Sequence, residues 1–303
     1  MKGRLRSRAI LMSLSLGMAA TVIGGGQADA AQAPVGLGTV ASFAVLAGTT
    51  VTNTGPSMIS GDLGVSPGTA VTGFPPGTVN NGSIHSADTV ATQAQADLTT
   101  AYNDAAGRSP SAAISPGLGG QTLIPGVYSG GALGLTGTLT LNAQGNPNAV
   151  FIFQASSTLI TDSSSTVALI GGANACNVFW QVGSSATLGT NSVFVGTVLA
   201  LTSVSADTGA KVAGRLLARN GAVTLDSNFV TAPTSCSSAS STTTTAVPTT
   251  AVPTTGVVVV PPAHTGKPWS SWIYWAGIAI VSVGGTLLLA PWRKRNSSRL
   301  VRK

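Results

Sequence analysis

Carboxylate side chains are the first groups in this 303-residue sequence that could do chemistry. Cleavage of a glycosidic bond, for example, requires two carboxylates that face each other across the substrate. The acidic residues of the central region are all aspartates and are scattered along the chain: Asp62, Asp88, Asp97, Asp104, Asp162, Asp207 and Asp226. They fall in expected turns or on a helix, where Asp bonds local backbone groups. We therefore predict no catalytic residues and no enzyme activity.

Histidine offers no recognisable catalytic or metal-binding pattern either. His85 precedes an expected helix without a Cys, Asp or Ser partner in a known motif, so we interpret it as a hydrogen-bonded loop residue. The sequence has no phosphate-binding loop, zinc-ligand spacing or calcium loop. These observations predict neither a metal nor a cofactor.

Cys176 and Cys236 are the two cysteines of the chain. Their number is even, and the N-terminus described below predicts export, which permits disulfides. We expect a disulfide that ties the end of the folded region to a preceding insertion, the alternative being two free buried thiols.

The positive net charge comes from the two ends of the chain. The formal charge is +7, but residues 31–266 hold four basic and seven acidic side chains. A nucleic-acid partner is therefore not expected, because the central region lacks a basic patch. Its one basic cluster, Lys211, Arg215 and Arg219, is interpreted as solvated outer-face residues.

The N-terminus predicts export. Residues 1–30 contain a basic stretch, an apolar run from Ala9 to Ile23 and the small-x-small pattern Ala28-Asp29-Ala30. This is typical of a secretory signal peptide, with a retained N-terminal anchor as the alternative.

The C-terminus predicts an anchor. Residues 237–266 are rich in Ser, Thr, Pro and Val and are expected to form an extended stalk. Residues 267–292 include an uncharged apolar run long enough to span a bilayer, and tryptophans flank it. The basic tail 293–303 is then cytoplasmic, and the folded region lies outside the cell.

A short motif precedes this apolar run. It resembles the cell-wall sorting signals of Gram-positive bacteria, with Pro in place of the usual Leu, and consists of Pro262, Ala263, His264, Thr265 and Gly266. The resemblance implies that sortase joins Thr265 to peptidoglycan. A plain membrane-anchored protein is the alternative, and either places the protein at the cell surface.

The region between these ends predicts short strands with one helix. Residues 86–106 carry apolar side chains three and four positions apart, with Ser86 as the expected N-cap and Gly107 as the stop. Elsewhere the chain repeats weakly every 16–20 residues with strand and turn patterns. We predict a β-solenoid, with an immunoglobulin-like sandwich as the alternative. Leu159, Leu188, Val204 and Val223 are expected to stack inward, so Thr158 and Thr187 share an outward column.

Several segments of residues 31–236 together resemble one protein family: Leu37–Leu46, Ile59–Gly68, Ile124–Tyr128, Val150–Gln154, Asn177–Leu188 and Gly214–Leu225. They are similar to bacterial and fungal ice-binding proteins of the DUF3494 type. The resemblance implies an irregular right-handed parallel β-solenoid of triangular section, with one long helix packed along it. It also implies that the partner is the ice or water surface.

A flat solenoid face could present Thr and Ser on a regular grid, because parallel strands lie about 4.7–4.9 Å apart. The candidate ice-binding residues are Thr158, Thr187, Thr190, Ser203, Ser205, Thr224, Thr69 and Thr72. The competing hypothesis is a non-enzymatic adhesion or structural module with the same fold.

Overall fold

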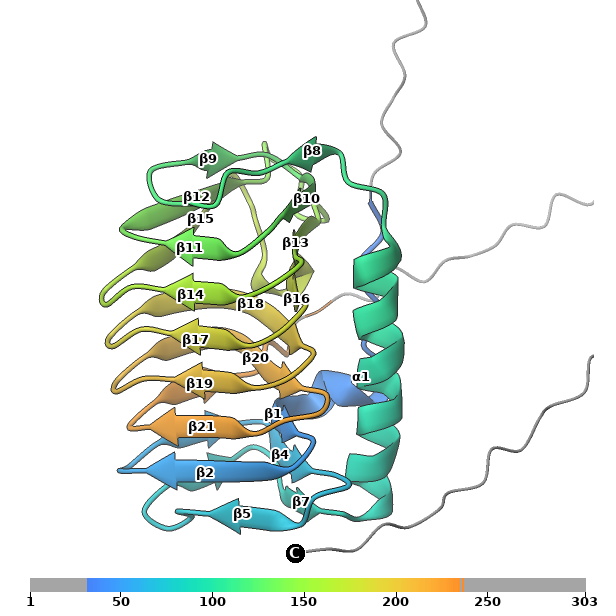
Figure 1. Cartoon of the computed structure of the whole chain (residues 1–303), viewed down its shortest axis with the longest axis vertical. Coiled ribbons are helices and arrows are strands. Elements are labelled where there is room, and N and C mark those ends of the chain that lie inside the picture. The colour runs from blue at the N-terminus through green and yellow to red at the C-terminus, as the bar shows by residue number, and fades with distance from the viewer. Residues whose placement is uncertain (1–31, 235, 237–303) are drawn as a thin grey trace, which may run out of the picture. The chain divides into compact units, whose positions relative to one another are not determined.

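The computed structural model describes residues 32–234 and 236. This part of the chain is built mainly from parallel strands, with one long helix beside them (Figure 1). The strands form three ladders, which we call faces a, b and c, so the predicted stack of strands with one helix is confirmed. No helix among the described residues is long and apolar enough to cross a membrane. The predicted signal peptide, stalk, sorting-like motif, apolar run and basic tail lie outside these residues.

Face b is a seven-stranded parallel sheet. From one end of the stack to the other its strands are β11 (Leu133–Leu135), β14 (Leu159–Thr161), β17 (Ala186–Leu188), β19 (Val204–Ala206), β21 (Val223–Asp226), β2 (Thr50–Thr54) and β5 (Ala70–Thr72). Figure 1 shows them one above another.

Faces a and c share two long strands, β18 (Val193–Ala200) and β20 (Lys211–Ala218). The remaining strands of face a are β8 (Ala112–Ala113), β10 (Gly126–Gly130), β13 (Phe151–Ala155), β16 (Val178–Val182), β1 (Phe43–Ala47), β4 (Asp62–Val65) and β7 (Ile84–Ser86). Those of face c are β9 (Thr122–Leu123), β12 (Thr138–Asn142), β15 (Thr166–Ile170), β22 (Phe229–Thr231), β3 (Met58–Ser60) and β6 (Thr78–Asn80). Two short 3₁₀ helices, Gly38–Ser42 and Ala175–Asn177, complete the described elements.

The two long strands pass from face c to face a at glycines. Gly196 has a φ of +113°, which side-chain-bearing residues rarely adopt. A Cβ on its partner Gly214 would lie 1.8 Å from the carbonyl oxygen of Gly196. Glycine is therefore required at this corner of the stack.

The order of strands in space differs from their order in sequence. The N-terminal strand β2 pairs with β21, and β3 pairs with β22, so the two ends of the folded region meet inside the stack. Every strand of face b therefore pairs with a strand on both sides except the two terminal ones: β5, and β11, whose outer edge makes only an isolated bridge between Gly134 and Gly117.

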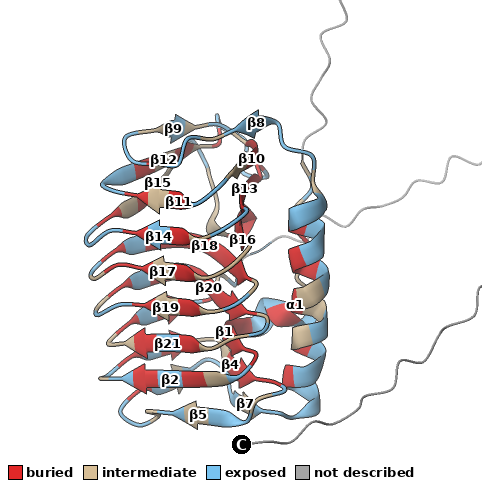
Figure 2. Cartoon of the chain, in the orientation of Figure 1, coloured by how far each residue is buried: buried red, intermediate tan, exposed pale blue. Residues whose placement is uncertain are grey.

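The core lies between the three faces. Along the strands of face b, buried residues alternate with residues that reach the surface, as Figure 2 shows. This is the period of two that side chains on a strand must follow. Inside the stack, aromatic rings of successive strands lie against one another, with ring centroids 4.0 Å apart for Phe153 and Trp180.

Helix α1 (Thr89–Gly107) packs its apolar side on face a. Ala94, Leu98 and Ala101 are fully buried there, as the helical spacing predicts. The predicted N-cap Ser86 is wrong: Ser86 ends β7, and the carboxylate of Asp88 accepts the Ala91 N–H instead. Gly107 is the last helical residue, and the helix end is completed by Gln154, whose side-chain amide donates to the carbonyls of Ala105 and Arg108.

The end of the described chain is fastened in two ways. The predicted disulfide joins Cys176 and Cys236, with Cα atoms 5.3 Å apart. Arg215, expected to be solvated, is instead 2% exposed and donates to the carbonyls of Ala41 and Pro233. It therefore links the N-terminal and C-terminal segments, and its burial lowers the pKa of the guanidinium to about 10, so that it stays charged at neutral pH.

Candidate functional site

Face b presents a straight column of outward side chains, which we call the central column. In register across the seven strands it consists of Gly134, Ile160, Thr187, Ser205, Thr224, Thr52 and Thr72. The last five members, on neighbouring strands, all carry hydroxyl groups. Their inward neighbours along the strands, such as Val204 and Val223, are fully buried, which fixes the orientation of the strands. Neighbouring members are about 4.7–4.9 Å apart because that is the spacing of paired strands.

A second column runs parallel to it, two residues earlier along the chain, at about 7 Å. This flanking column consists of Thr50 on β2, its partner Ala70 on β5, and the residues just before β14, β17, β19 and β21, which are Thr158, Ser185, Ser203 and Ala222. Its serines bond the backbone of the adjacent turn: the hydroxyl of Ser185 accepts from Ser203 N–H at 3.3 Å, and that of Ser203 accepts from Ala222 N–H at 3.2 Å. The flanking column is therefore less regular than the central column.

The structure divides the predicted candidates into three groups. Thr187, Ser205, Thr224 and Thr72 lie in the central column. Thr158 and Ser203 lie in the flanking column. Thr69 is exposed just before β5, and Thr190 is half-buried in the turn after β17, so neither belongs to a column.

The predicted alignment of Thr158 with Thr187 is wrong by two residues. In the structure Ile160 pairs with Thr187, and Leu159 pairs with Ala186. A shift of two keeps every inward residue inward, so the apolar pattern alone could not detect it. Leu159, Leu188, Val204 and Val223 are all buried, as predicted, although Leu188 belongs to a different inward column.

Thr52 was missed because its strand comes from the other end of the folded region. The signal that could have found it is the alternation in Thr50-Val51-Thr52-Asn53-Thr54, with Val51 fully buried and Asn53 7% exposed. It pairs with Thr224 on one side and Thr72 on the other, and so completes the central column.

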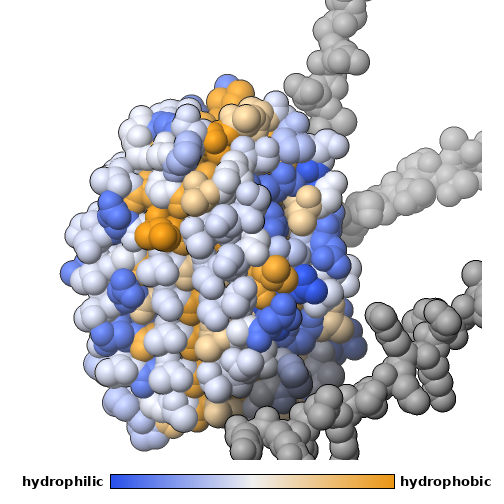
Figure 3. Space-filling view, viewed as in Figure 1, coloured by the Kyte–Doolittle hydropathy of each residue, from blue (hydrophilic) through white to orange (hydrophobic). Residues whose placement is uncertain are grey.

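Charged groups are kept to the edge of face b. Neither column contains a charged residue, whereas Asp162, Asp207 and Asp226 lie where the chain turns towards face c. The carboxylate of Asp226 accepts hydrogen bonds from Thr208 and Ser227, and that of Asp162 accepts one from Thr136. Figure 3 shows face b as largely pale, near-neutral surface with some apolar patches and with hydrophilic atoms gathered at its margins. The two columns of face b therefore present mainly methyl and hydroxyl groups rather than charges.

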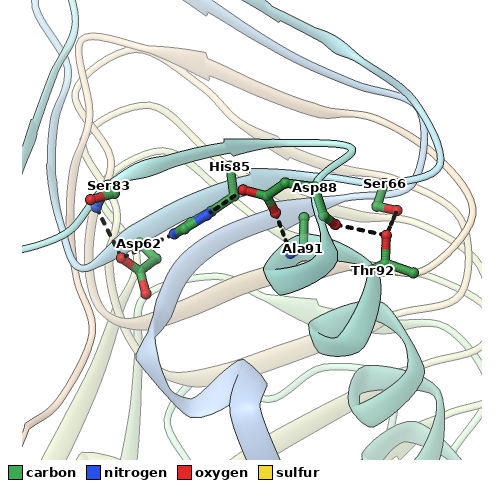
Figure 4. Close-up of polar contacts among 7 residues, drawn as sticks. All are labelled: Asp62, Ser66, Ser83, His85, Asp88, Ala91 and Thr92. Atoms are coloured by element: carbon green, nitrogen blue, oxygen red, sulfur yellow. Dashed lines mark hydrogen bonds and ion pairs between the residues drawn. The ribbon is translucent and has the colours of Figure 1, made fainter.

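A cluster of titratable side chains lies at the start of α1, where His85 stands between two carboxylates (Figure 4). His85 Nδ1 is 2.8 Å from Asp88 Oδ2, and Nε2 is 3.8 Å from Asp62 Oδ1. Asp62 also accepts the Ser83 N–H at 2.9 Å. The hydrogen bond from the Ala91 N–H lowers the pKa of the Asp88 carboxyl, and the weaker effect of the hydrogen bond with His85 lowers it further.

This cluster has a structural role. His85 is hydrogen-bonded, as expected, although it lies on β7 rather than in a loop; both ring nitrogens face carboxylates and neither faces a nucleophile. Among the described residues no group of three His, Cys, Asp or Glu side chains is arranged to hold a metal. The cluster fixes the helix start against β4.

Comparison with known proteins gives consistent matches over this region. A family model described as Ice-binding-like matches residues 45–231. An ice-binding protein of Nostoc sp. (strain HG1) is 55% identical over 197 residues, covering 64% of this chain and 72% of that protein. Another from Flavobacterium frigoris (strain PS1) is 36% identical over 214 residues, covering 66% and 76%.

Solved structures agree. The crystal structure of an ice-binding protein from an Antarctic biological consortium has a TM-score of 0.65 at 51% identity and covers 67% of this chain and 92% of that one. The structure of an ice-binding protein from the ascomycete Antarctomyces psychrotrophicus has a TM-score of 0.65 at 45% identity, covering 67% and 100%. The folded region here therefore corresponds to the full length of the chain in that crystal structure.

Proposed function

Because this chain belongs to the ice-binding-like protein family, we propose that it binds ice, and that it does so by adsorbing through face b. The observation that carries the assignment to face b is the run of five hydroxyl side chains in the central column, Thr187, Ser205, Thr224, Thr52 and Thr72. They stand on neighbouring strands in unbroken register.

The physical basis is a pre-ordered surface that holds water without charges. A Thr side chain is stiff at χ1, so the backbone fixes the positions of its methyl and hydroxyl groups. The strand spacing of about 4.7–4.9 Å repeats these groups at an interval close to a repeat of the ice lattice. Because χ1 of the four threonines is already restricted before binding, little side-chain ordering remains to be done, which lowers the entropic cost of adsorption.

Ice activity of the folded region tests this proposal. We expect the oxidised fragment 32–236 to inhibit ice recrystallisation and to show thermal hysteresis, and we expect both to disappear when it is denatured. A folded fragment that is inactive at high concentration would contradict the proposal.

A second candidate function is adhesion, and face c gives it a specific basis. Met58, Phe229 and Val193 are 43–47% exposed there, and in register with them stands Lys211. An adhesion module would use this mixed apolar and cationic patch rather than the uncharged columns of face b. Binding to a ligand or surface that persists when the central column of face b is substituted would favour adhesion.

We also propose that the protein is exported and held at the cell surface. Support comes from the signal-like residues 1–30 and from the apolar run and basic tail after residue 266. If sortase uses the motif, Thr265→Ala will move the protein from the cell-wall fraction to the membrane fraction. An unchanged distribution would leave plain membrane anchoring as the explanation.

A further inference from the structure

The central column changes its chemistry between β17 and β14. From Thr72 to Thr187 every member carries a hydroxyl group, whereas the next two members are Ile160 and Gly134. The hydroxyl pattern therefore covers one part of face b and stops before its upper end in Figure 1.

The backbone does not cause this interruption. Leu159, Ile160 and Thr161 pair with Ala186, Thr187 and Leu188 without a register shift, and β11 pairs with β14 in the same way. The strands under the last two members thus continue the same ladder, and only the side chains differ.

These side chains alter both the water-binding groups and the level of the surface. Ile160 is 49% exposed, has no hydroxyl, and extends one carbon further from its Cβ than Thr does. On the next strand Gly134 has no side chain at all. The face therefore carries an apolar projection followed by a gap, where a flat lattice plane would need level, hydrogen-bonding groups.

We propose that ice contact is confined to the five strands from β17 to β5 and that Ile160 sets the boundary of the contact surface. This inference rests on the proposed function and specifies its extent. Ile160 determines the extent of the contact surface. It ends the hydroxyl column, although the paired strands beyond it could present further hydroxyl side chains.

The structure permits the column to be extended. Ile160→Thr exchanges one β-branched residue for another at an exposed strand position, so the strand is retained. A Cβ at Gly134 would lie 3.7 Å from the Pro116 carbonyl oxygen, which is ordinary contact, and Gly134 is not in the left-handed backbone region. Gly134→Thr is therefore also accommodated.

The test compares Ile160→Thr, and Ile160→Thr combined with Gly134→Thr, with the unchanged fragment 32–236 by thermal hysteresis at equal concentration. We expect higher activity in the single variant and a larger rise in the double variant. The matched control is Ile170→Thr, which makes the same chemical change at a 46%-exposed position on β15 of face c. It should leave the activity unchanged.

Melting temperatures of all variants show whether folding is retained. Equal or lower activity in a folded Ile160→Thr variant would overturn the boundary, as would an equal rise in Ile170→Thr. If the unchanged fragment and both face b variants lack ice activity, the proposed function itself fails. An active fragment that Ile160→Thr does not improve refutes only the boundary.

Discussion

At the scale of single residues, the candidate site depends on the kind of side chain that each outward position carries. Thr187, Ser205, Thr224 and Thr72 could be predicted because each alternates with an apolar neighbour that must face inward. The hydroxyl identity and the outward direction were both visible in the sequence. Their membership of one column was not, because that depends on register.

Arg215 shows where reasoning from residue type fails. A cation in a solvent-facing strand pattern is ordinarily exposed, yet here the guanidinium is 2% exposed and satisfies carbonyls from both ends of the folded region. Its partners are Ala41 and Pro233, which are far from it in sequence. The residues around Arg215 in the sequence therefore give no indication that it is buried.

We predict that Arg215→Met lowers the free energy of unfolding of the fragment by about 2–4 kcal/mol, because the carbonyls of Ala41 and Pro233 lose the donor that links the two ends of the folded region. Chemical denaturation measures this change. Lys211→Met, at an exposed position four residues earlier on the same strand, is the control and should change stability little. Equal effects of the two substitutions would show that the hydrogen bonds of Arg215 contribute nothing specific to stability.

At the scale of elements, the sequence predicted which segments form strands or the helix better than it predicted where the helix starts and how the strands pair. The helix was found within three residues of its ends because its apolar positions recur at helical spacing on one side. Its start was misplaced since Ser86 and Asp88 are both good caps, and only the bond from Ala91 N–H identifies Asp88.

Strand register was predicted less well than strand identity. The alternation in β14 and β17 fixes which residues face inward but is equally satisfied after a shift of two residues. The disulfide between Cys176 and Cys236 was predicted correctly because the chain has two cysteines and the expected compartment permits oxidation.

At the scale of the whole folded region, the site exists because the two ends of the chain meet. Strand β2 enters the stack beside β21, so that Thr52 continues the column begun by Thr187, Ser205 and Thr224. Repeats counted along the sequence could not show this, because the N-terminal strands follow the C-terminal ones in space. A continuous hydroxyl surface is therefore a property of the assembled stack.

The most direct test of the central claim replaces Thr224, near the middle of the hydroxyl run, with a bulky residue. We predict that Thr224→Tyr in the fragment 32–236 abolishes thermal hysteresis, because the ring holds the flat face away from ice. Thr231→Tyr, at an exposed Thr on β22 of face c, should retain full activity. Retained activity in a folded Thr224→Tyr variant would contradict ice binding through face b.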